Sequence, residues 1–207
     1  MKLILVDDHA AVRQATALAL MHRLDCEIAA SVGTGQEALD AIQRHPDVDI
    51  VLLDLELEQV QGFDPVQIAR SAHEVGTHVV VYSAHSEAIW VCRMVDDVSV
   101  EGYIHKGDGL DELAAALSAV ESGASYYSRR VTRVQTTVRS LGLDCAELET
   151  LQLYALNLTG EEIAARQHCS DRTLRRRMQH IKKALHLPNG MKNALVALVA
   201  RRRGLIV

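Results

Sequence analysis

Five short apolar runs, rich in Val, Ile and Leu, recur through the first half of the 207-residue chain and constrain its fold more than any other feature. They lie at residues 2–6, 26–32, 49–53, 78–82 and 100–104. Runs of this kind, without polar alternation, are typical of parallel strands that are covered on both faces. Helix-like segments fill the gaps, so the pattern predicts an α/β fold with a doubly wound parallel sheet.

Helix start signals support this prediction. The segment Thr34–Glu37 has the spacing of a capping box, and Asp64 precedes Pro65 at a first helical position. We expect Asp108 to cap the helix that follows the last strand. In such a sheet, ligands bind beyond the carboxyl ends of the strands, where the strand order reverses.

The charge of the chain changes sign along its length. Residues 1–123 contain 7 Lys and Arg against 21 Asp and Glu, a net charge of −14, whereas residues 124–207 contain 15 against 6, a net charge of +9. This asymmetry predicts two domains with different partners, and the basic half favours a polyanion. We expect a first domain over residues 1–122, a linker over 123–142 and a second domain over 143–207.

The cysteines and the hydropathy pattern indicate the class of protein. Cys26, Cys92, Cys145 and Cys169 include no C-x-x-C pair, so we expect reduced thiols, mostly buried, and neither disulfides nor a thiolate metal site. No apolar run approaches the roughly 20 residues of a membrane span, and the N-terminus has no cleavable signal pattern. We expect a cytoplasmic protein without membrane contact.

Carboxylates follow two of the predicted strands. Asp7 and Asp8 come after the run 2–6, and Asp54 comes directly after the run 49–53. Because neighbouring parallel strands end at the same edge of a sheet, these three carboxylates should converge in one crevice, where they repel one another unless a cation is present. Mg²⁺ suits carboxylate, carbonyl and water ligands and can bridge to a phosphoryl oxygen. The cluster therefore predicts a phosphoryl-transfer site.

Two further side chains should line the same crevice. Ser83 follows the run 78–82, and Lys106 follows the run 100–104. A hydroxyl and an ammonium group are the donors that a phosphoryl group on Asp54 requires. Each residue alone is weak evidence, because a strand-end Asp is usually a cap and a single Lys is usually solvated. The five together, each after its strand, favour a functional site.

Over about residues 1–122, this motif set resembles the receiver domain of response regulators, which implies a flavodoxin-like (βα)5 fold. The resemblance implies that Asp54 is the phospho-acceptor and that Asp8 and Asp54 bind Mg²⁺ directly, while Asp7 acts through water. It also implies that the backbone carbonyl of Glu56 is a metal ligand, and that Ser83 and Lys106 bind the phosphoryl group.

The resemblance further implies a switch pair, in which the Ser83 hydroxyl moves to the phosphoryl oxygen and the Tyr103 ring rotates into the space left behind. The chain also departs from the family pattern. Leu57 and Glu58 replace the usual Met-Pro after the acceptor, so that Glu56 and Glu58 make the loop unusually acidic. Negative charge there should disfavour a phosphoryl group or demand tighter neutralisation by a metal, so phosphorylation kinetics need not be typical.

After Leu143 the pattern is entirely helical, with helices expected at about 144–156, 160–167, 171–185 and 191–202. Thr159 begins a capping box and Ser170 can cap the next helix, which together predict a helix-turn-helix. The helix from 171 carries an apolar stripe on one face and cationic residues on the other. The side chains expected to contact DNA are Arg172, Thr173, Arg175, Arg176, Gln179, Lys182 and Lys183.

This stretch, about residues 143–207, resembles the LuxR-type helix-turn-helix of NarL/FixJ response regulators, an all-α four-helix domain. Asn157 replaces the family's Gly before the first of the two helices, a change compatible with a left-handed turn. By position, Arg175, Arg176 and Gln179 would face base edges, whereas Arg172, Lys182 and Lys183 would contact phosphates. In this family the last helix forms a two-fold contact, so the resemblance implies a homodimer on DNA.

The leading hypothesis is a two-component response regulator, not an enzyme: a sensor histidine kinase phosphorylates Asp54, and the dimer binds double-stranded promoter DNA as a transcription factor. One alternative keeps the fold but makes DNA binding independent of phosphorylation, with the acidic loop mimicking charge. Another is a Mg²⁺-dependent phosphohydrolase with Asp54 as nucleophile. It is disfavoured because Glu56 is the single candidate acid two residues later and because the basic domain would be unexplained.

Overall fold

The computed structural model describes residues 1–57 and 64–207, which form two compact units. The first unit comprises Met1–His85 and Val98–Thr132, and the second comprises Ser86–Asp97 and Arg133–Val207. The short segment Ser86–Asp97 thus groups with the C-terminal residues, although in sequence it lies between two strands of the first unit. These units do not follow the predicted domain bounds of 1–122, 123–142 and 143–207, which remain a proposal.

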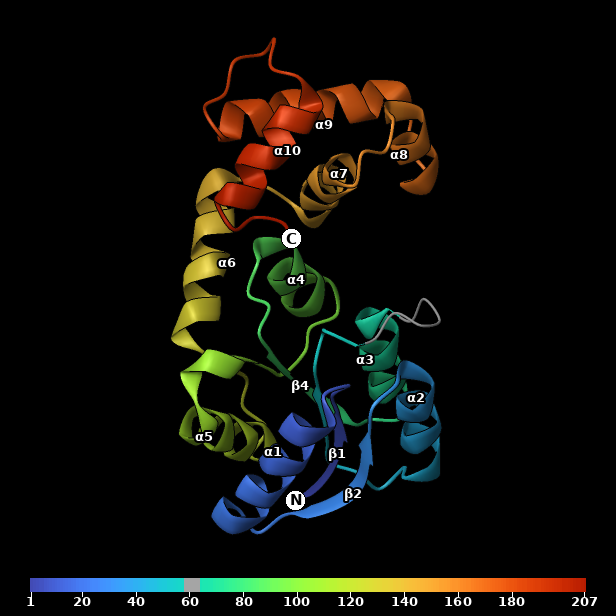
Figure 1. The fold of residues 1–207 in the computed structure, drawn as a ribbon, viewed down its shortest axis with the longest axis vertical. Coiled ribbons are helices and arrows are strands. Elements are labelled where there is room, and N and C mark those ends of the chain that lie inside the picture. The colour runs from blue at the N-terminus through green and yellow to red at the C-terminus, as the bar shows by residue number, and fades with distance from the viewer. Residues whose placement is uncertain (58–63) are drawn as a thin grey trace. The chain divides into compact units, whose positions relative to one another are not determined.

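The first unit is a parallel sheet of six strands in the order β2-β1-β3-β4-β5-β6. The strands are β1 (Lys2–Val6), β2 (Glu27–Val32), β3 (Ile50–Leu53), β4 (His78–Ser83), β5 (Gly102–His105) and β6 (Tyr126–Tyr127). Helices α1 (Ala10–Arg23) and α5 (Leu110–Glu121) lie on one side of the sheet, and α2 (Gly35–Arg44) and α3 (Pro65–Glu74) on the other (Figure 1). The predicted doubly wound fold is confirmed, with the order reversing between β1 and β3.

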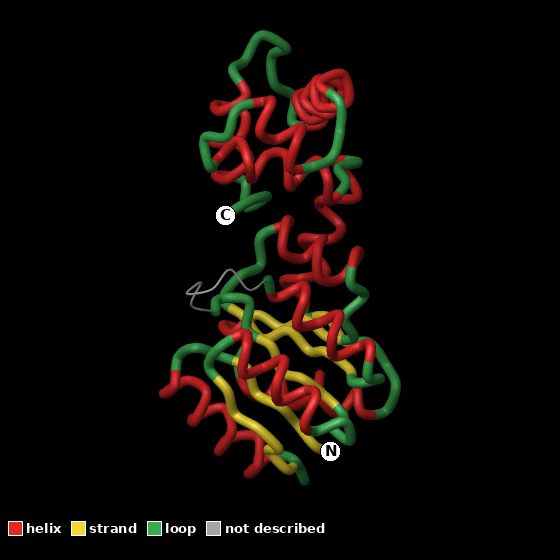
Figure 2. The backbone as a smooth tube through the Cα atoms, turned by 90° about the vertical axis from the view of Figure 1, so that its right-hand side faces the viewer, coloured by secondary structure: helices red, strands yellow, loops and turns green. Residues whose placement is uncertain are grey.

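The central strands lie where their sequences predict. All four residues of β3 are buried, and β4 is buried from Val79 onward, as expected for strands that helices cover on both faces (Figure 2). The two-residue strand β6 extends the sheet at the edge of β5 and was not predicted. It is too short to produce a periodic pattern in the sequence.

Two predicted helix starts are confirmed and one is wrong. The Thr34 side chain accepts a hydrogen bond from the Glu37 amide at 3.3 Å, and Asp64 accepts one from the Val66 amide at 3.0 Å. Asp108 does not cap α5; it ends a 3-10 turn, and the residue before the helix is Gly109 with φ of +93°. A glycine suits that position because side chains disfavour positive φ.

The second unit is helical. It contains α4 (Ala88–Val91), a π-helical turn (Cys92–Asp97), most of α6 (Arg129–Leu141), α7 (Cys145–Ala155), α8 (Gly160–Arg166), α9 (Asp171–Ala184) and α10 (Asn193–Arg202). The four helices predicted after Leu143 are present. Much of the segment expected as a linker is helix α6, in which Val131 and Val138 are buried. Asn157 has φ of +62°, as expected for a left-handed turn.

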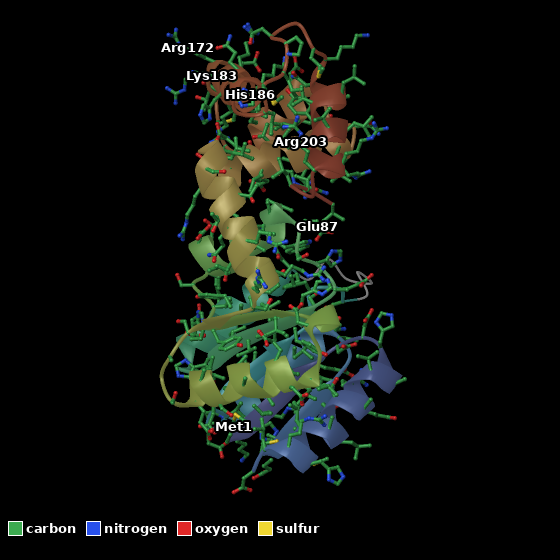
Figure 3. All side chains as sticks on the ribbon, turned by 90° about the vertical axis from the view of Figure 1, so that its left-hand side faces the viewer. Met1, Glu87, Arg172, Lys183, His186 and Arg203 are labelled. Atoms are coloured by element: carbon green, nitrogen blue, oxygen red, sulfur yellow. A yellow bond between two sulfur atoms is a disulfide. The ribbon has the colours of Figure 1, made fainter. Side chains whose placement is uncertain are left out.

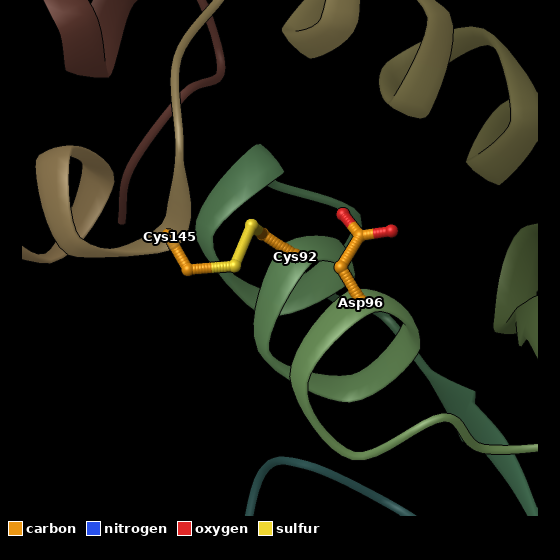
Figure 4. Close-up of side chains that lie close together, drawn as sticks. All are labelled: Cys92, Asp96 and Cys145. Atoms are coloured by element: carbon orange, nitrogen blue, oxygen red, sulfur yellow. A yellow bond between two sulfur atoms is a disulfide. The ribbon is translucent and has the colours of Figure 1, made fainter.

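A disulfide joins two of the four cysteines, contrary to the expectation of reduced thiols. Cys92 is bonded to Cys145, with their Cα atoms 5.6 Å apart, while Cys26 and Cys169 are free (Figure 4). The pairing was not visible in the sequence because 53 residues separate the partners and only the packing of α4 beside α7 brings them together. In the described parts of the chain, no helix has the length and apolarity needed to cross a bilayer.

Candidate functional site

The register of the central strands brings the predicted carboxylates together. Val6 pairs with Leu53 across β1 and β3, and the Asp54 amide donates to the Val6 carbonyl at 2.8 Å. Asp7 and Asp54 therefore leave adjacent strands at the same edge of the sheet, where both are buried, with 7% and 2% of their surface exposed. Three carboxylates, with Asp8 beside them, share this edge.

Lys106 neutralises part of this charge. It follows β5, and its ammonium nitrogen Nζ lies 2.5 Å from Asp54 Oδ2 and 2.7 Å from Asp7 Oδ2. Burial lowers the pKa of Lys106, but the hydrogen bonds to Asp54 and Asp7 outweigh it, so the pKa is raised above its ordinary value. Lys106 therefore lies as a cation between the two carboxylates, in the crevice that the sequence predicted it to line.

The remaining negative charge fits a divalent cation. One ligand atom from each of Asp7, Asp8, His9 and Asp54 lies within 4.8 Å of the others. Asp8 Oδ1 is buried and makes no hydrogen bond among the described residues, although His9 Nδ1 lies 2.6 Å away. A partly neutralised carboxylate cluster of this kind is a donor set for a hard metal ion.

The loop after β3 also contributes to the pocket. The Glu56 amide donates to Asp54 Oδ1 at 3.2 Å, which holds the backbone of residue 56 beside Asp54. The Glu56 side chain is exposed. Glu58, the second residue of the predicted acidic rim, lies outside the described residues.

The two predicted switch residues meet at a residue that the sequence did not reveal. The buried Ser83 hydroxyl accepts a hydrogen bond from the His85 amide at 3.3 Å, and the buried Tyr103 hydroxyl donates to the His85 carbonyl at 3.0 Å. Val81 pairs with Tyr103 across β4 and β5, which sets the Tyr103 ring beside the end of β4. The loop after β4 is thus tied to both side chains.

Arg13, in the first turns of α1, is another residue that sequence reasoning missed. Its guanidinium donates to the backbone carbonyl of Asp7 and so holds the loop that carries Asp7 and Asp8. No motif marks this position in the sequence. Only its place one helical turn after the acidic pair could have suggested it.

In the second unit, α9 separates its apolar and cationic faces as predicted. Leu174, Met178 and Ile181 are buried, and Ser170 caps the helix by accepting from the Thr173 amide at 3.2 Å. Of the side chains predicted to contact DNA, Arg172, Arg175, Arg176, Gln179 and Lys183 are exposed, and Figure 3 shows Arg172 and Lys183 pointing away from the unit. Thr173 is partly buried at the cap.

Lys182 differs from its predicted placement. Only 8% of it is exposed, and its ammonium donates to the Asn189 carbonyl at 3.1 Å in the connection to α10. Lys182 continues the row of Leu174 and Met178 at four-residue spacing, so its aliphatic stem packs inward. Its predicted role as a phosphate contact is therefore corrected to a structural one.

Comparison with known proteins identifies the family. Residues 3–118 match the response regulator receiver domain. The chain belongs to the response regulator family. The nitrate/nitrite response regulator NarP of Escherichia coli K12 is 24% identical over 97% of this chain and 95% of its own length. The oxygen regulatory protein NreC of Staphylococcus carnosus is 26% identical over 90% of this chain and 92% of its own.

Solved structures show the same two-part fold. A complex of the two-component response regulator RcsB with DNA superposes with a TM-score of 0.66, at 20% identity over 98% of both chains. RcsB from Salmonella enterica serovar Typhimurium, bound to promoter rprA in the presence of the phosphomimetic BeF3−, gives 0.65 at 18% identity over 96% of this chain and 98% of its own. The likeness to these structures shows the fold of a receiver domain followed by a helical domain.

Proposed function

We propose that Asp54 of this response regulator accepts a phosphoryl group from a sensor histidine kinase and that the phosphorylated protein binds promoter DNA as a homodimer. The observation that carries the proposal is the buried Asp54 carboxylate, held by Lys106 and adjacent to Asp7. This is a nucleophile with a cation in place to receive charge as it develops. The predicted cytoplasmic location is part of the proposal.

Mg²⁺ fits the donor set described above. Asp7, Asp8, Asp54 and the backbone carbonyl of Glu56 would hold it. When bound, it supplies positive charge that neutralises phosphoryl oxygens. The residues of this chain carry out the phosphoryl transfer. An oxygen of Asp54 attacks the phosphorus of a phosphohistidine, the P–N bond breaks with its electron pair leaving on the imidazole, and an acyl phosphate remains.

Lys106 and Ser83 then stabilise the product. The Lys106 ammonium, which now divides its hydrogen bonds between Asp54 and Asp7, turns to a phosphoryl oxygen, and the Ser83 hydroxyl donates to another. Ser83 and Tyr103 are both bonded to His85, so movement of the hydroxyl alters the contacts of the loop after β4. We propose the Ser83 and Tyr103 pair as the switch on this basis.

The protein is proposed to be a phosphorylated regulator and not an enzyme with turnover. A phosphohydrolase acting through Asp54 needs a general acid close by, and Glu56, the candidate two residues later, is exposed. The C-terminal unit adds a function that a hydrolase would not require. Residues 124–207, which include most of this unit, have a net charge of +9, and the exposed cationic face of α9 suits insertion into a major groove.

DNA binding is proposed to use Arg175, Arg176 and Gln179 at base edges and Arg172 and Lys183 at phosphates. The RcsB structures, in which a relative binds DNA, support this assignment. Dimerisation is proposed through α10, whose Leu195 and Leu198 are 50% and 45% exposed. Two large apolar side chains at this exposure on one helix face are what a two-fold contact would cover.

The test is stoichiometric labelling with a small-molecule phosphodonor and Mg²⁺. We expect the mass of one phosphoryl group to appear on the peptide that contains Asp54, with no continued release of phosphate. The matched control is Asp54→Asn, which preserves the size of the side chain and removes the nucleophile. Labelling of the control at the parent's level, or many turnovers by the parent, would contradict the proposal.

A further inference from the structure

The segment Ser86–Asp97 follows β4 and is anchored in the C-terminal unit by its backbone. The amides of Ala88 and Ile89 donate to the carbonyls of Gly204 and Leu205, each at 3.0 Å. The first amides of a helix have no partner within the helix, so the C-terminal tail supplies the acceptors that α4 lacks. This pairing fixes both the start of α4 and the end of the chain.

Apolar packing reinforces this anchor. Ala88, Ile89 and Cys92 are 1%, 4% and 4% exposed and belong to the hydrophobic core of the C-terminal unit. The same core contains Leu148 of α7 and Ile206 of the tail. The α4 segment is therefore an integral part of the helical unit that carries α9.

The Cys92–Cys145 disulfide adds a covalent link, called the latch below, to this packing of the α4 segment. Cys92 begins the π-helical turn after α4, and Cys145 is the first residue of α7, so the bond joins the two elements end to end (Figure 4). The Cα separation of 5.6 Å lies in the usual range for a disulfide, so the packing already holds the two residues at bonding distance. Cys145 is partly exposed, whereas Cys92 is buried.

A carboxylate lies beside the two sulfur atoms. One carboxylate oxygen of Asp96 is within 4.8 Å of both, and its other contact is an ion pair with Arg139 at 4.0 Å. Thiol–disulfide exchange proceeds by attack of a thiolate, so a neighbouring negative charge repels the attacking group. Asp96 is placed to slow exchange at this bond.

We propose that Cys92 and Cys145 form a reversible thiol–disulfide switch that latches α4 to the DNA-binding unit. In the oxidised protein the α4 segment is locked; in the reduced protein non-covalent contacts hold it, among them the packing and the two backbone hydrogen bonds, and it can detach. In reducing compartments, disulfides are usually transient or regulatory, so a bonded pair with one partly exposed cysteine is suited to this role.

The co-reactants of this thiol–disulfide exchange are low-molecular-weight thiols and their disulfides. On oxidation, two cysteine thiols and one glutathione-type disulfide give the protein disulfide and two small thiols, through a mixed disulfide. Reduction is the reverse, in which a thiolate attacks Cys145 Sγ and Cys92 leaves as the thiolate. No metal or further oxidant is required.

The latch has a consequence for signalling, and this part of the inference rests on the proposed function. The segment begins one residue after His85, the residue bonded to both Ser83 and Tyr103. A locked segment resists the loop movement that a phosphoryl group on Asp54 would drive. The oxidised protein should therefore respond less to phosphorylation than the reduced protein.

The test uses the full chain equilibrated in glutathione redox buffers, with each thiol located by alkylation and peptide mapping. We expect Cys92 and Cys145 to convert together between thiol and disulfide. We further expect the amides of Ala88 and Ile89 to exchange with deuterium at least about tenfold faster after reduction, because they report directly on the anchor. This measurement involves no phosphodonor, so it is independent of the proposed function.

Cysteine variants distinguish the effect of the Cys92–Cys145 disulfide from effects of other thiols in the protein. Cys92→Ser and Cys145→Ser should each show the fast exchange of the reduced protein in every redox buffer, whereas Cys169→Ser, which removes a free thiol of the same unit, should behave like the parent. Asp96→Asn should speed reduction several-fold, with Asp97→Asn as the control. The proposal of a redox switch would be overturned if millimolar glutathione did not reduce the Cys92–Cys145 disulfide. It would also be overturned if amide hydrogen exchange at Ala88 and Ile89 were unchanged after reduction.

The signalling consequence has its own readout. With beryllofluoride and Mg²⁺ present, the gain in DNA affinity should be at least about fivefold larger for the reduced protein than for the oxidised one. An equal gain in DNA affinity for the reduced and oxidised proteins would overturn the proposed coupling to phosphorylation, while the proposal that Cys92 and Cys145 form a reversible disulfide would still stand. No gain in either form, with normal redox conversion, would count against the proposed function and the coupling together.

Discussion

At the scale of single residues, the site depends on ion pairs that are mostly shielded from water. Lys106 is held between two buried carboxylates, and its removal would leave Asp7 and Asp54 without a cationic partner. Breaking such a pair costs far more than its net contribution to stability, because the uncompensated charge stays buried. The cation is therefore structural in the resting protein as well as available for a phosphoryl group.

We predict that Lys106→Met lowers the free energy of unfolding of the first unit by about 2–3 kcal/mol, and that Mg²⁺ restores part of the loss. The matched control is Lys2→Met, which removes an exposed ammonium paired with Asp47 at 2.7 Å and should change stability little. Urea unfolding with and without Mg²⁺ measures both. Equal losses in the two variants would contradict the assignment.

A second prediction concerns Glu101, which precedes β5. Its carboxylate accepts hydrogen bonds from His73 Nε2 at 3.2 Å and from the Val79 amide at 2.8 Å. Burial raises the pKa of Glu101, but these hydrogen bonds outweigh it and lower the pKa from 4.5 to about 2. The ionised form thus stabilises the fold fully above pH 4.5, and this contribution is lost as the pH falls towards 2.

We expect Glu101→Gln to reduce the free energy of unfolding by about 1–2 kcal/mol at neutral pH, a value lowered for the partial exposure of the group. The difference from the parent should shrink as the pH falls below 4.5. Chemical unfolding across a series of pH values measures this. A difference that is the same at every pH would mean that packing, and not charge, explains the loss.

At the scale of elements, the sequence predicted those features that follow from periodicity and register. Asp7, Asp54 and Lys106 each follow an apolar run, and parallel strands that begin in register end at one edge. The capping boxes at Thr159 and Asp144 fix two helix starts in the same local way, although only the first was predicted. Contacts between distant segments were not accessible: nothing in the sequence indicates that the Tyr103 hydroxyl donates to the His85 carbonyl, 18 residues away.

Lys182 shows how a composition-based assignment fails within an element. A basic residue on a cationic helix was assigned to the exposed face, but its four-residue spacing from Met178 places it on the buried side. Log affinity for DNA falls linearly with log salt concentration, and we predict that Lys183→Ala reduces the magnitude of this slope by about 1. Lys182→Met should instead leave the slope unchanged and lower the stability of the C-terminal unit, since its bond to Asn189 is lost.

Salt-dependent binding by fluorescence anisotropy, paired with thermal unfolding, tests the two lysines together. The two variants each remove one positive charge, at neighbouring positions, so the salt dependence compares where the two charges lie. If both lowered the slope equally, the inward placement of Lys182 would be wrong.

At the scale of the whole molecule, the chain joins an acidic segment of net charge −14 to a basic segment of +9. The first contains the carboxylate cluster and the second the exposed cationic helix, so the two halves of the function are separated along the sequence as the charge count indicated. The membership of Ser86–Asp97 in the C-terminal unit was not predicted. It depends on Cys92 and Cys145 and on the terminal residues Gly204 and Leu205, which are distant from the segment in sequence.

The central claim is that a phosphoryl group on Asp54 drives formation of the DNA-binding dimer. The most direct measurement is the solution mass by light scattering, with Mg²⁺ and beryllofluoride, of the parent and of Asp54→Ala. The account predicts that the mass of the parent doubles and that the variant stays monomeric. A monomer in both cases, or a dimer in both, would contradict it.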